Sequence, residues 1–485
     1  MISKPKYSAG DDQPRVIIRN DISGGANSRV AGHLIKDNQV TVLYNGDIGT
    51  PGQSSKRPGS VLIADDLGAN SVIGLHNFAI QGATDLLLSF ENLTLRSWNG
   101  SAATWSSVHT FSASTEVGMI SAKESGLTPD DVVIIQNGID NAHRIDAAGN
   151  NQDLGSTAGT GSDSPPVSTV MAWYGNRVWV LKNDLLYFSL AYDDDYSSAF
   201  DTVSDVFRVP VGEERGIVST RDTGMIIMGA DGIWGLAPSV VPDPTKDKPE
   251  PLVTNRGVVS KKAWVNAGDD IYYFAQDGFR ALKRTIQDKL QAGVELPISY
   301  GLKDEYERIA FTYIDRVCME YFDNKIFIAV PTSATAFDTW VYYPATQSFM
   351  IIQGWSPRCW SRYRVGNEER LYYGKQGDGT VYRAWYGYTD EGTTTTDGTA
   401  INYQEEGRKE DMGEPLVKKA GGVLKIKAKS SGDYALSVYA EVDDGGYSLL
   451  GTMNLAGNSP TLPVNLPFNL ASANIVIGEF HLEPL

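Results

Sequence analysis

Residues 269–282 read DDIYYFAQDGFRAL: a short aromatic and β-branched strand, a tight Asp277-Gly278 turn and a second strand. Alternation such as that of Ile271 and Tyr273 is typical of half-buried strands. Asp-Gly pairs accept the positive φ angles of hairpin turns. Similar strand–turn–strand units recur between about residues 70 and 390, at 85–105, 176–190, 224–236, 324–352 and 369–385. Such a chain is expected to form a ring of similar sheets.

The spacing of these units predicts the fold class. Strand pairs recur roughly every 40–55 residues, the spacing of four-stranded propeller blades. The stretch 71–390 would then hold about six or seven blades. The repeat is degenerate and carries no Trp-Asp dipeptide. We predict an all-β protein whose main domain, 71–390, is a β-propeller.

The segments on either side of the repeats differ in character. Residues 1–70 gather Gly, Pro and Ser around one strand-like run, and we interpret them as an N-terminal arm or entry segment. Residues 391–403 form a polar linker. Residues 404–485 alternate again, as in the run GGVLKIKAK, with apolar side chains on one face and lysines on the other. This pattern predicts a small antiparallel β-sandwich at the C-terminal end.

The net charge of −17 limits the classes of function. Proteins that grip nucleic acid phosphates do so with clustered Lys and Arg, so the charge argues against that class. A like-charged wall would still let nucleic acid slide past. No apolar run approaches the roughly 18–20 residues of a membrane span. The start, MISKPKYSAGDDQPRV, lacks the apolar stretch of a secretory signal, so we expect synthesis in a cytoplasm.

Metal or cofactor chemistry has little support in the sequence. The two cysteines, Cys318 and Cys359, exclude a disulfide scaffold by number, and we interpret them as half-buried thiols. No two histidines are spaced as paired metal ligands. The five histidines are His33, His76, His109, His143 and His481. We expect neither a metal nor a cofactor.

Some propellers are glycosidases, which need two carboxylates in different environments. The densest acidic run is Asp193, Asp194 and Asp195. Adjacent Asp side chains diverge, which favours a solvated loop, a weak cation site or an acidic patch along a channel. No Walker, G-x-S-x-G or H-E-x-x-H pattern occurs. We therefore predict no catalytic residues and no enzymatic activity.

The sharpest basic cluster is WSPRCWSRYR, residues 355–364. Arginines interleaved with aromatic residues can stack on nucleic acid bases. They are also enriched at protein interfaces, or they pair with nearby acids in a folded strand. The acidic net charge favours the latter two interpretations. The candidate inter-subunit or partner interface comprises Trp355, Arg358, Trp360, Arg362 and Arg364.

Four segments, taken together and in order, resemble the tail nozzle (tail hub) proteins of short-tailed, podovirus-type bacteriophages, including those called packaged-DNA stabilisation proteins. They are NQVTVLYNGDIGTPGQSSKRPGS (38–60), YGNRVWVLKNDLLYFSLAYDDDYSSAFD (174–201), NAGDDIYYFAQDGFRAL (266–282) and GKQGDGTVYRAW (374–385). The resemblance covers most of residues 30–390 in pattern.

The resemblance implies a structural virion protein with a propeller fold. Such a protein forms a ring, expected to be a homohexamer, at the distal end of the tail. It closes the DNA channel and opens for ejection. The implied partners are other copies of the chain, a portal-adaptor (head-to-tail connector) protein, and tail fibre, tailspike or needle proteins. Double-stranded DNA would pass without sequence-specific binding. The implied location is the virion tail, after assembly in the host bacterial cytoplasm.

Two alternatives come from other functional classes. A receptor- or glycan-binding propeller at a tail tip predicts an exposed aromatic platform in the loops, whereas the long loops here are rich in Gly, Ser, Thr and Pro. A propeller glycoside hydrolase predicts a convergent carboxylate pair at the centre of the propeller.

Overall fold

The computed structural model describes residues 21–113, 116–125, 131–155, 163–193, 196–220, 224–268, 270–290, 296–410, 423–426, 434–442, 446–454, 464–467 and 475–484. Antiparallel strands dominate these residues. Their helical segments are α1 (Leu282–Leu290), α2 (Lys303–Glu307) and the 3-10 turns η1 (Ile298–Gly301) and η2 (Phe311–Arg316). The predicted all-β class is confirmed.

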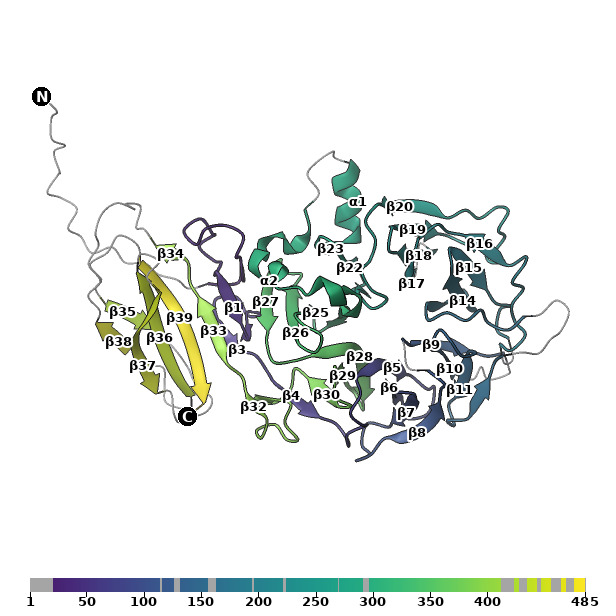
Figure 1. The fold of residues 1–485 in the computed structure, drawn as a ribbon, viewed down its shortest axis with the longest axis horizontal. Coiled ribbons are helices and arrows are strands. Elements are labelled where there is room, and N and C mark those ends of the chain that lie inside the picture. Colours follow the sequence, from purple (N-terminus) through teal and green to yellow (C-terminus); the bar gives the residue numbers. More distant parts are fainter. Residues whose placement is uncertain are drawn as a thin grey trace, which may run out of the picture.

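Within the described residues, seven sheets form the blades of a propeller (Figure 1). The first three are β5 (Val72–Phe78), β6 (Leu86–Glu91), β7 (Thr94–Trp98) and β8 (Ser106–Thr110); β9 (Gly118–Lys123), β10 (Asp131–Gln136), β11 (His143–Asp146) and β12 (Asn151–Asp153); and β13 (Met171–Tyr174), β14 (Arg177–Lys182), β15 (Leu185–Phe188) and β16 (Val206–Arg208). The fourth is β17 (Glu214–Thr220), β18 (Gly224–Gly229), β19 (Gly232–Leu236) and β20 (Glu250–Thr254), and the fifth is β21 (Trp264–Asn266), β22 (Ile271–Ala275) and β23 (Gly278–Ala281). The sixth begins with β24 (Cys318–Phe322), β25 (Lys325–Pro331), β26 (Phe337–Tyr343) and β27 (Ser348–Ile352), and the seventh is β28 (Pro357–Val365), β29 (Glu368–Lys375), β30 (Val381–Ala384) and β4 (Ser60–Leu62).

The first strand of each blade lies innermost, because these strands contact one another around the ring. Strand β5 contacts β9 and β28, β13 contacts β9 and β17, and β24 contacts β21 and β28. The indole N–H of Trp264 in β21 donates to the carbonyl of Arg215 in β17 at 3.4 Å. The ring is therefore continuous, and its seven blades match one of the two numbers expected from the sequence.

Apolar side chains between neighbouring blades form the core. Strand β10 illustrates this, because its buried run alternates between two clusters. Val133 and Ile135 pack with the first blade. Val132 and Ile134 pack with the third. A strand covered on both faces reads as a continuous apolar run, which explains the sequence VVII at this place.

The ring is closed by an N-terminal strand. Strand β4 pairs antiparallel with β30, so that Leu62 lies opposite Tyr382 and Ser60 opposite Ala384. The seventh blade thus combines three strands from the end of the repeats with one from residues 60–62. The boundary predicted at residue 70 leaves this strand outside the propeller to which it belongs.

The sixth blade continues into the C-terminal part of the chain (Figure 1). Strand β1 (Val42–Tyr44) pairs parallel with β27 and antiparallel with β33 (Tyr403–Glu406), and from there the sheet continues through β39 (Ile475–Pro484), β36 (Tyr434–Val442) and β37 (Tyr447–Asn454). The short strand β34 (Lys409–Glu410) also pairs with β39. The remaining two-stranded sheets are β2 (Gly46–Asp47) with β3 (Ser55–Lys56), β31 (Thr389–Asp390) with β32 (Thr399–Ala400), and β35 (Val423–Ile426) with β38 (Val464–Pro467). The C-terminal strands are antiparallel as predicted, and the sandwich itself stays a prediction.

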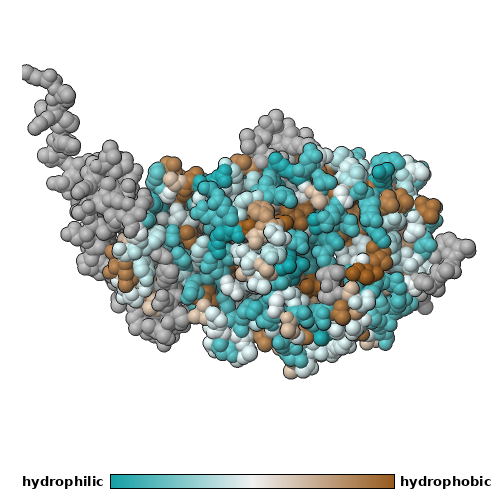
Figure 2. Space-filling model, viewed as in Figure 1, coloured by the Kyte–Doolittle hydropathy of each residue, from teal (hydrophilic) through white to brown (hydrophobic). Residues whose placement is uncertain are grey.

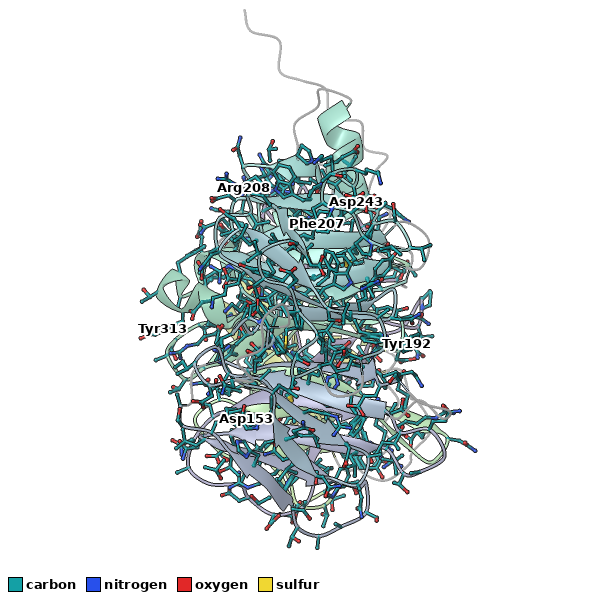
Figure 3. The ribbon with its side chains drawn as sticks, turned by 90° about the vertical axis from the view of Figure 1, so that its right-hand side faces the viewer. Asp153, Tyr192, Phe207, Arg208, Asp243 and Tyr313 are labelled. Carbon is teal, nitrogen blue, oxygen red and sulfur yellow. The ribbon has the colours of Figure 1, made fainter. Side chains whose placement is uncertain are left out.

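The propeller has two faces. We call the side on which the innermost strands begin the start face, and the side on which they end the end face. Figure 3 shows the ring edge-on, with Tyr192 on one side and Tyr313, Arg208 and Asp153 on the other. Tyr192 belongs to the loop after β15 and marks the end face, whereas Tyr313 precedes β24 and marks the start face. No helix in the described part of the chain has the length and apolar character needed to cross a membrane.

Candidate functional site

At the start face, side chains cross the axis of the propeller. Lys261 and Lys262 lie between β20 and β21. Nζ of Lys261 is 2.9 Å from a carboxylate oxygen of Glu116, which precedes β9, and it donates to the hydroxyl of Thr169 at 2.8 Å. Nζ of Lys262 donates to the carbonyl of Ile73 in β5. These contacts, which we call the axial clasp, link the fifth blade to the first three.

The charges of the axial clasp are partly withdrawn from water. Burial lowers the pKa of Lys262. Burial alone would raise the pKa of Glu116, but the ammonium groups of Lys261 and Lys262 and the Arg358 guanidinium outweigh it and hold this pKa below its usual value. A Cβ on Gly118 would lie 2.0 Å from the carbonyl oxygen of Thr169, so the chain also approaches itself closely here. Side chains and close backbone contacts therefore bridge the start-face end of the axis.

The predicted interface segment begins with a buried indole. Trp355 is 0% exposed, and its ring stacks on Tyr373 at 5.4 Å between centroids. Its Nε1–H donates to Asp390 at 2.8 Å. The Arg57 guanidinium lies over the same ring, 4.6 Å from its centroid. Trp355 is therefore a core residue and cannot contact a partner in the folded chain.

Next to that indole, Arg57 and Asp390 form a buried ion pair. The two guanidinium nitrogens Nη1 and Nη2 donate to the two carboxylate oxygens at 2.8 and 2.7 Å. Nε donates to Asn45 at 2.9 Å, and the remaining hydrogens reach the carbonyls of Pro58 and Gln353. All five N–H groups have acceptors, as a buried guanidinium requires. Arg57 directly precedes β4, the strand that closes the ring, and Asp390 lies in β31 after the seventh blade. We therefore call this pair the closure latch.

The rest of the predicted segment lies on β28, the innermost strand of the seventh blade. Trp360 is 7% exposed and packs against Phe327. The Arg362 guanidinium is 3.2 Å from Glu320 of β24, and it reaches Glu369 at 3.6 Å. Burial raises the pKa of Glu320, with Arg362 acting against it.

The three arginines of this segment differ in exposure. Arg358 and Arg362 are half-buried, and Arg364 is exposed. The predicted set therefore ranges from buried indoles to half-buried and exposed arginines, and Arg364 is its most accessible member. A neighbouring subunit would have to reach it at the end face.

The predicted acidic cluster is only partly described. Asp193 is half-buried in the loop that follows β15, and its carboxylate accepts the backbone N–H of Tyr196 at 3.0 Å. Asp194 and Asp195 lie outside the described residues. No group of three or more His, Cys, Asp or Glu in the described ranges could hold a metal ion.

The end face carries two long loops with exposed apolar side chains. The loop of residues 189–205 follows β15, and that of residues 237–249 follows β19. Their most exposed apolar side chains are Leu190 (53%), Val203 (83%), Val240 (95%) and Val241 (71%). Figure 2 views the opposite, start face, where hydrophobic residues form small separate patches among hydrophilic ones.

Two clefts lie on the end face. One, of about 350 Å³, lies between the sixth and seventh blades and has both charged and apolar residues in its lining. Its Glu368 is already paired with Arg370 at 2.6 Å and with Arg383. The other, of about 460 Å³, lies beside the axis between the first three blades. We call it the axial cleft.

Sequence reasoning missed both the axial clasp and the closure latch. Nothing in the local sequence shows that Lys261 and Lys262 point across the ring. Arg57 lies within the nozzle-like segment 38–60, but its acidic partner is 333 positions away. An arginine within a Gly- and Pro-rich stretch is the one local feature that could have suggested such a pair.

The architecture defines a seven-bladed β-propeller with an extended sixth sheet. A scan against known protein families finds no match, and a search of curated proteins finds none either. Similar solved structures include the extracellular domain of a putative one-component system from B. thetaiotaomicron (11% identity, TM-score 0.41, 84% of this chain and 48% of that chain). PorZ of the type-IX secretion system of Porphyromonas gingivalis is similar at 11% identity (TM-score 0.42, 85% and 56%), and Chaetomium thermophilum Raptor at 10% (TM-score 0.39, 67% and 29%). The chain spans less than two thirds of each of these, and no function is transferred from them.

Proposed function

We propose that this chain is a structural virion protein of a short-tailed phage. It forms a homohexameric ring, the nozzle or hub, at the distal end of the tail. The ring closes the DNA channel to retain the packaged genome and opens for ejection. In this proposal the chain acts in the virion tail after assembly in the host cytoplasm, and it has no enzymatic activity.

The observation that carries the proposal is the place of the four nozzle-like segments in the fold. Residues 38–60 contain β1 and the closure-latch arginine and lead into β4. The other three segments lie within the third, fifth and seventh blades: residues 174–201 span β14 and β15, 266–282 span β22 and β23, and 374–385 contain β30. The four segments therefore fall on strands of one propeller, in the order in which the resemblance has them.

The extended sixth sheet supports a role as a rigid building block. Through β1 and β33 it joins the propeller to the C-terminal strands by continuous backbone pairing. A closed ring needs two different patches on each subunit, one for each neighbour. The propeller and the C-terminal sheet supply two different surfaces of this kind.

The charge of the chain also suits a channel that DNA must leave. Six chains of −17 each would carry about −100, and a wall of like charge repels phosphates instead of binding them. The partners in this proposal are a portal-adaptor protein above the ring and fibre, tailspike or needle proteins below it. Double-stranded DNA passes transiently, without sequence-specific binding.

Imaging of particles tests the proposal. Cryo-electron microscopy of virions from the phage that encodes the chain should show six copies at the distal tail end. Particles assembled without the chain should lose packaged DNA to added nuclease, whereas complemented particles should keep it. A tail resolved without this chain, or full DNA retention in its absence, would overturn the proposal.

A further inference from the structure

The axial cleft is a cavity of about 460 Å³ that none of the preceding roles uses. This size lies within the roughly 300–1,000 Å³ of small-ligand sites. Three blades contribute to it at the end face, close to the axis. Its lining comes from the segment after β5, which includes Gln81 and Asp85, from Lys123 at the end of β9, from Asp131 at the start of β10 and from Trp173 of β13.

One side of the axial cleft is apolar and aromatic. The ring of Trp173 is half-buried and is held edge-on by two tyrosines, Tyr192 at 6.2 Å and Tyr196 at 6.3 Å between centroids. Tyr192 is 39% exposed and extends the aromatic surface toward the loop of residues 189–205. Trp173 and Tyr192 therefore form a partly exposed aromatic surface on the end face.

The other side is polar, and its groups are fixed by their own neighbours. Lys123 is 3.0 Å from Asp131, which also accepts the backbone N–H of Gln81 at 2.6 Å. Asp85 accepts the backbone N–H of Ile80 at 3.1 Å. The Lys123 side chain is 42% exposed, and Gln81 is exposed. The lining thus offers both donors and acceptors, held in place before any ligand arrives.

The chemistry of this lining selects among ligand classes. Two carboxylates against one ammonium disfavour an anion. A hydrocarbon would remove water from the polar groups without replacing its hydrogen bonds. A sugar ring carries apolar C–H faces together with hydroxyls that both donate and accept. We propose that the axial cleft binds a neutral saccharide, with a ring face on Trp173 and hydroxyls on Gln81, Asp85 and Lys123.

Binding to the isolated, folded chain tests this inference, independently of ring assembly. The probes are maltotriose, cellotriose and triacetylchitotriose, with a galacturonic acid trimer as the anionic comparison. Saturation-transfer NMR should detect at least one neutral trisaccharide, with a dissociation constant on the order of 1 mM, typical of a shallow single site. The acidic trimer should bind at least about tenfold more weakly.

Three variants separate the site from the rest of the surface. Trp173→Ala should abolish binding. Gln81→Ala removes an exposed amide and should weaken binding about two- to tenfold without affecting folding. Tyr388→Ala removes an aromatic side chain that is 59% exposed but lies outside the cleft, and it should bind as the parent chain does. Unchanged binding by Gln81→Ala, or no neutral trisaccharide bound at about 10 mM, would overturn the inference.

Discussion

Replacing Asp390 by Asn tests how the ring of blades is held closed. In the closure latch the Arg57 side chain is 0% exposed and that of Asp390 is 7% exposed. The substitution keeps the shape but removes the negative charge, and it turns an N–H of the new amide toward an arginine N–H. Arg57 then stays buried without a counter-charge.

The expected loss is large because the pair is buried and bidentate. Removing one partner of such a pair costs about 3–5 kcal/mol, since the other charge is left uncompensated. Replacing both partners by apolar residues of similar volume costs much less. We therefore expect Asp390→Asn to lose about 3–4 kcal/mol and Arg57→Met/Asp390→Leu to lose less than about 2 kcal/mol. Part of the second loss comes from the indole N–H of Trp355, which then lacks its acceptor.

Hydrogen exchange locates the effect. The backbone N–H of Ile63 donates to Val381 at 3.0 Å and reports on the junction of the N-terminal segment with the seventh blade. In Asp390→Asn the opening free energy of this amide should fall by about the same 3–4 kcal/mol, the whole expected loss. The opening free energies of amides in the third blade, such as that of Val180, should change little. A change below about 1 kcal/mol at Ile63, or a double variant as unstable as the single one, would refute this account of the latch.

Three further predictions concern single contacts, each read from urea unfolding. Gly59→Ala places a Cβ 1.9 Å from the carbonyl oxygen of Thr389 and should lose about 1–3 kcal/mol, whereas Gly301→Ala, with 3.6 Å to its nearest neighbour, should lose less than about 1 kcal/mol; equal losses would contradict the clash. Lys261→Met breaks a half-exposed clasp and should lose about 1 kcal/mol, and no loss would show that the clasp is energetically neutral. Burial lowers the pKa of His76 to about 4. Between pH 6.5 and 4 the imidazole is therefore protonated in the unfolded chain but neutral in the folded chain. Stability should fall by up to about 3 kcal/mol as pH decreases from 6.5 to 4, and His76→Gln should remove that part of the fall; an unchanged pH profile would contradict it.

The repeats were predictable because propeller strands leave a local signature. Apolar runs covered on both faces, such as that of β10, are visible in the sequence, and so are their turn residues. The turns themselves were placed less well. Two-residue hairpins with two positive φ angles occur at Asn183-Asp184 and Asp323-Asn324. At the predicted Asp277-Gly278 turn, by contrast, the glycine already opens β23 and the turn residues are Gln276 and Asp277. Local composition marks where a chain turns, but strand register decides which residues occupy the turn.

The candidate site was less predictable, because its contacts join residues distant in sequence. The aromatic residues of WSPRCWSRYR looked like a surface patch, yet Trp355 and Trp360 are buried. Alternation along an innermost strand sends side chains toward both neighbouring blades, so aromatic residues there fill the core. The burial of the two indoles depends on the neighbouring blades, whose positions the local sequence does not show.

The axial clasp has a consequence for the proposed ring. Because Lys261, Lys262 and Glu116 make contacts across the start-face end of the axis, we do not expect DNA to pass along the axis of a single propeller. A DNA channel must then lie between subunits and be walled by the outer surfaces of the blades or by the C-terminal sheet. Opening for ejection would change contacts between neighbouring chains and leave the blades of each chain intact. In this proposal the closure latch stiffens each subunit, and the gate lies at the boundaries between subunits.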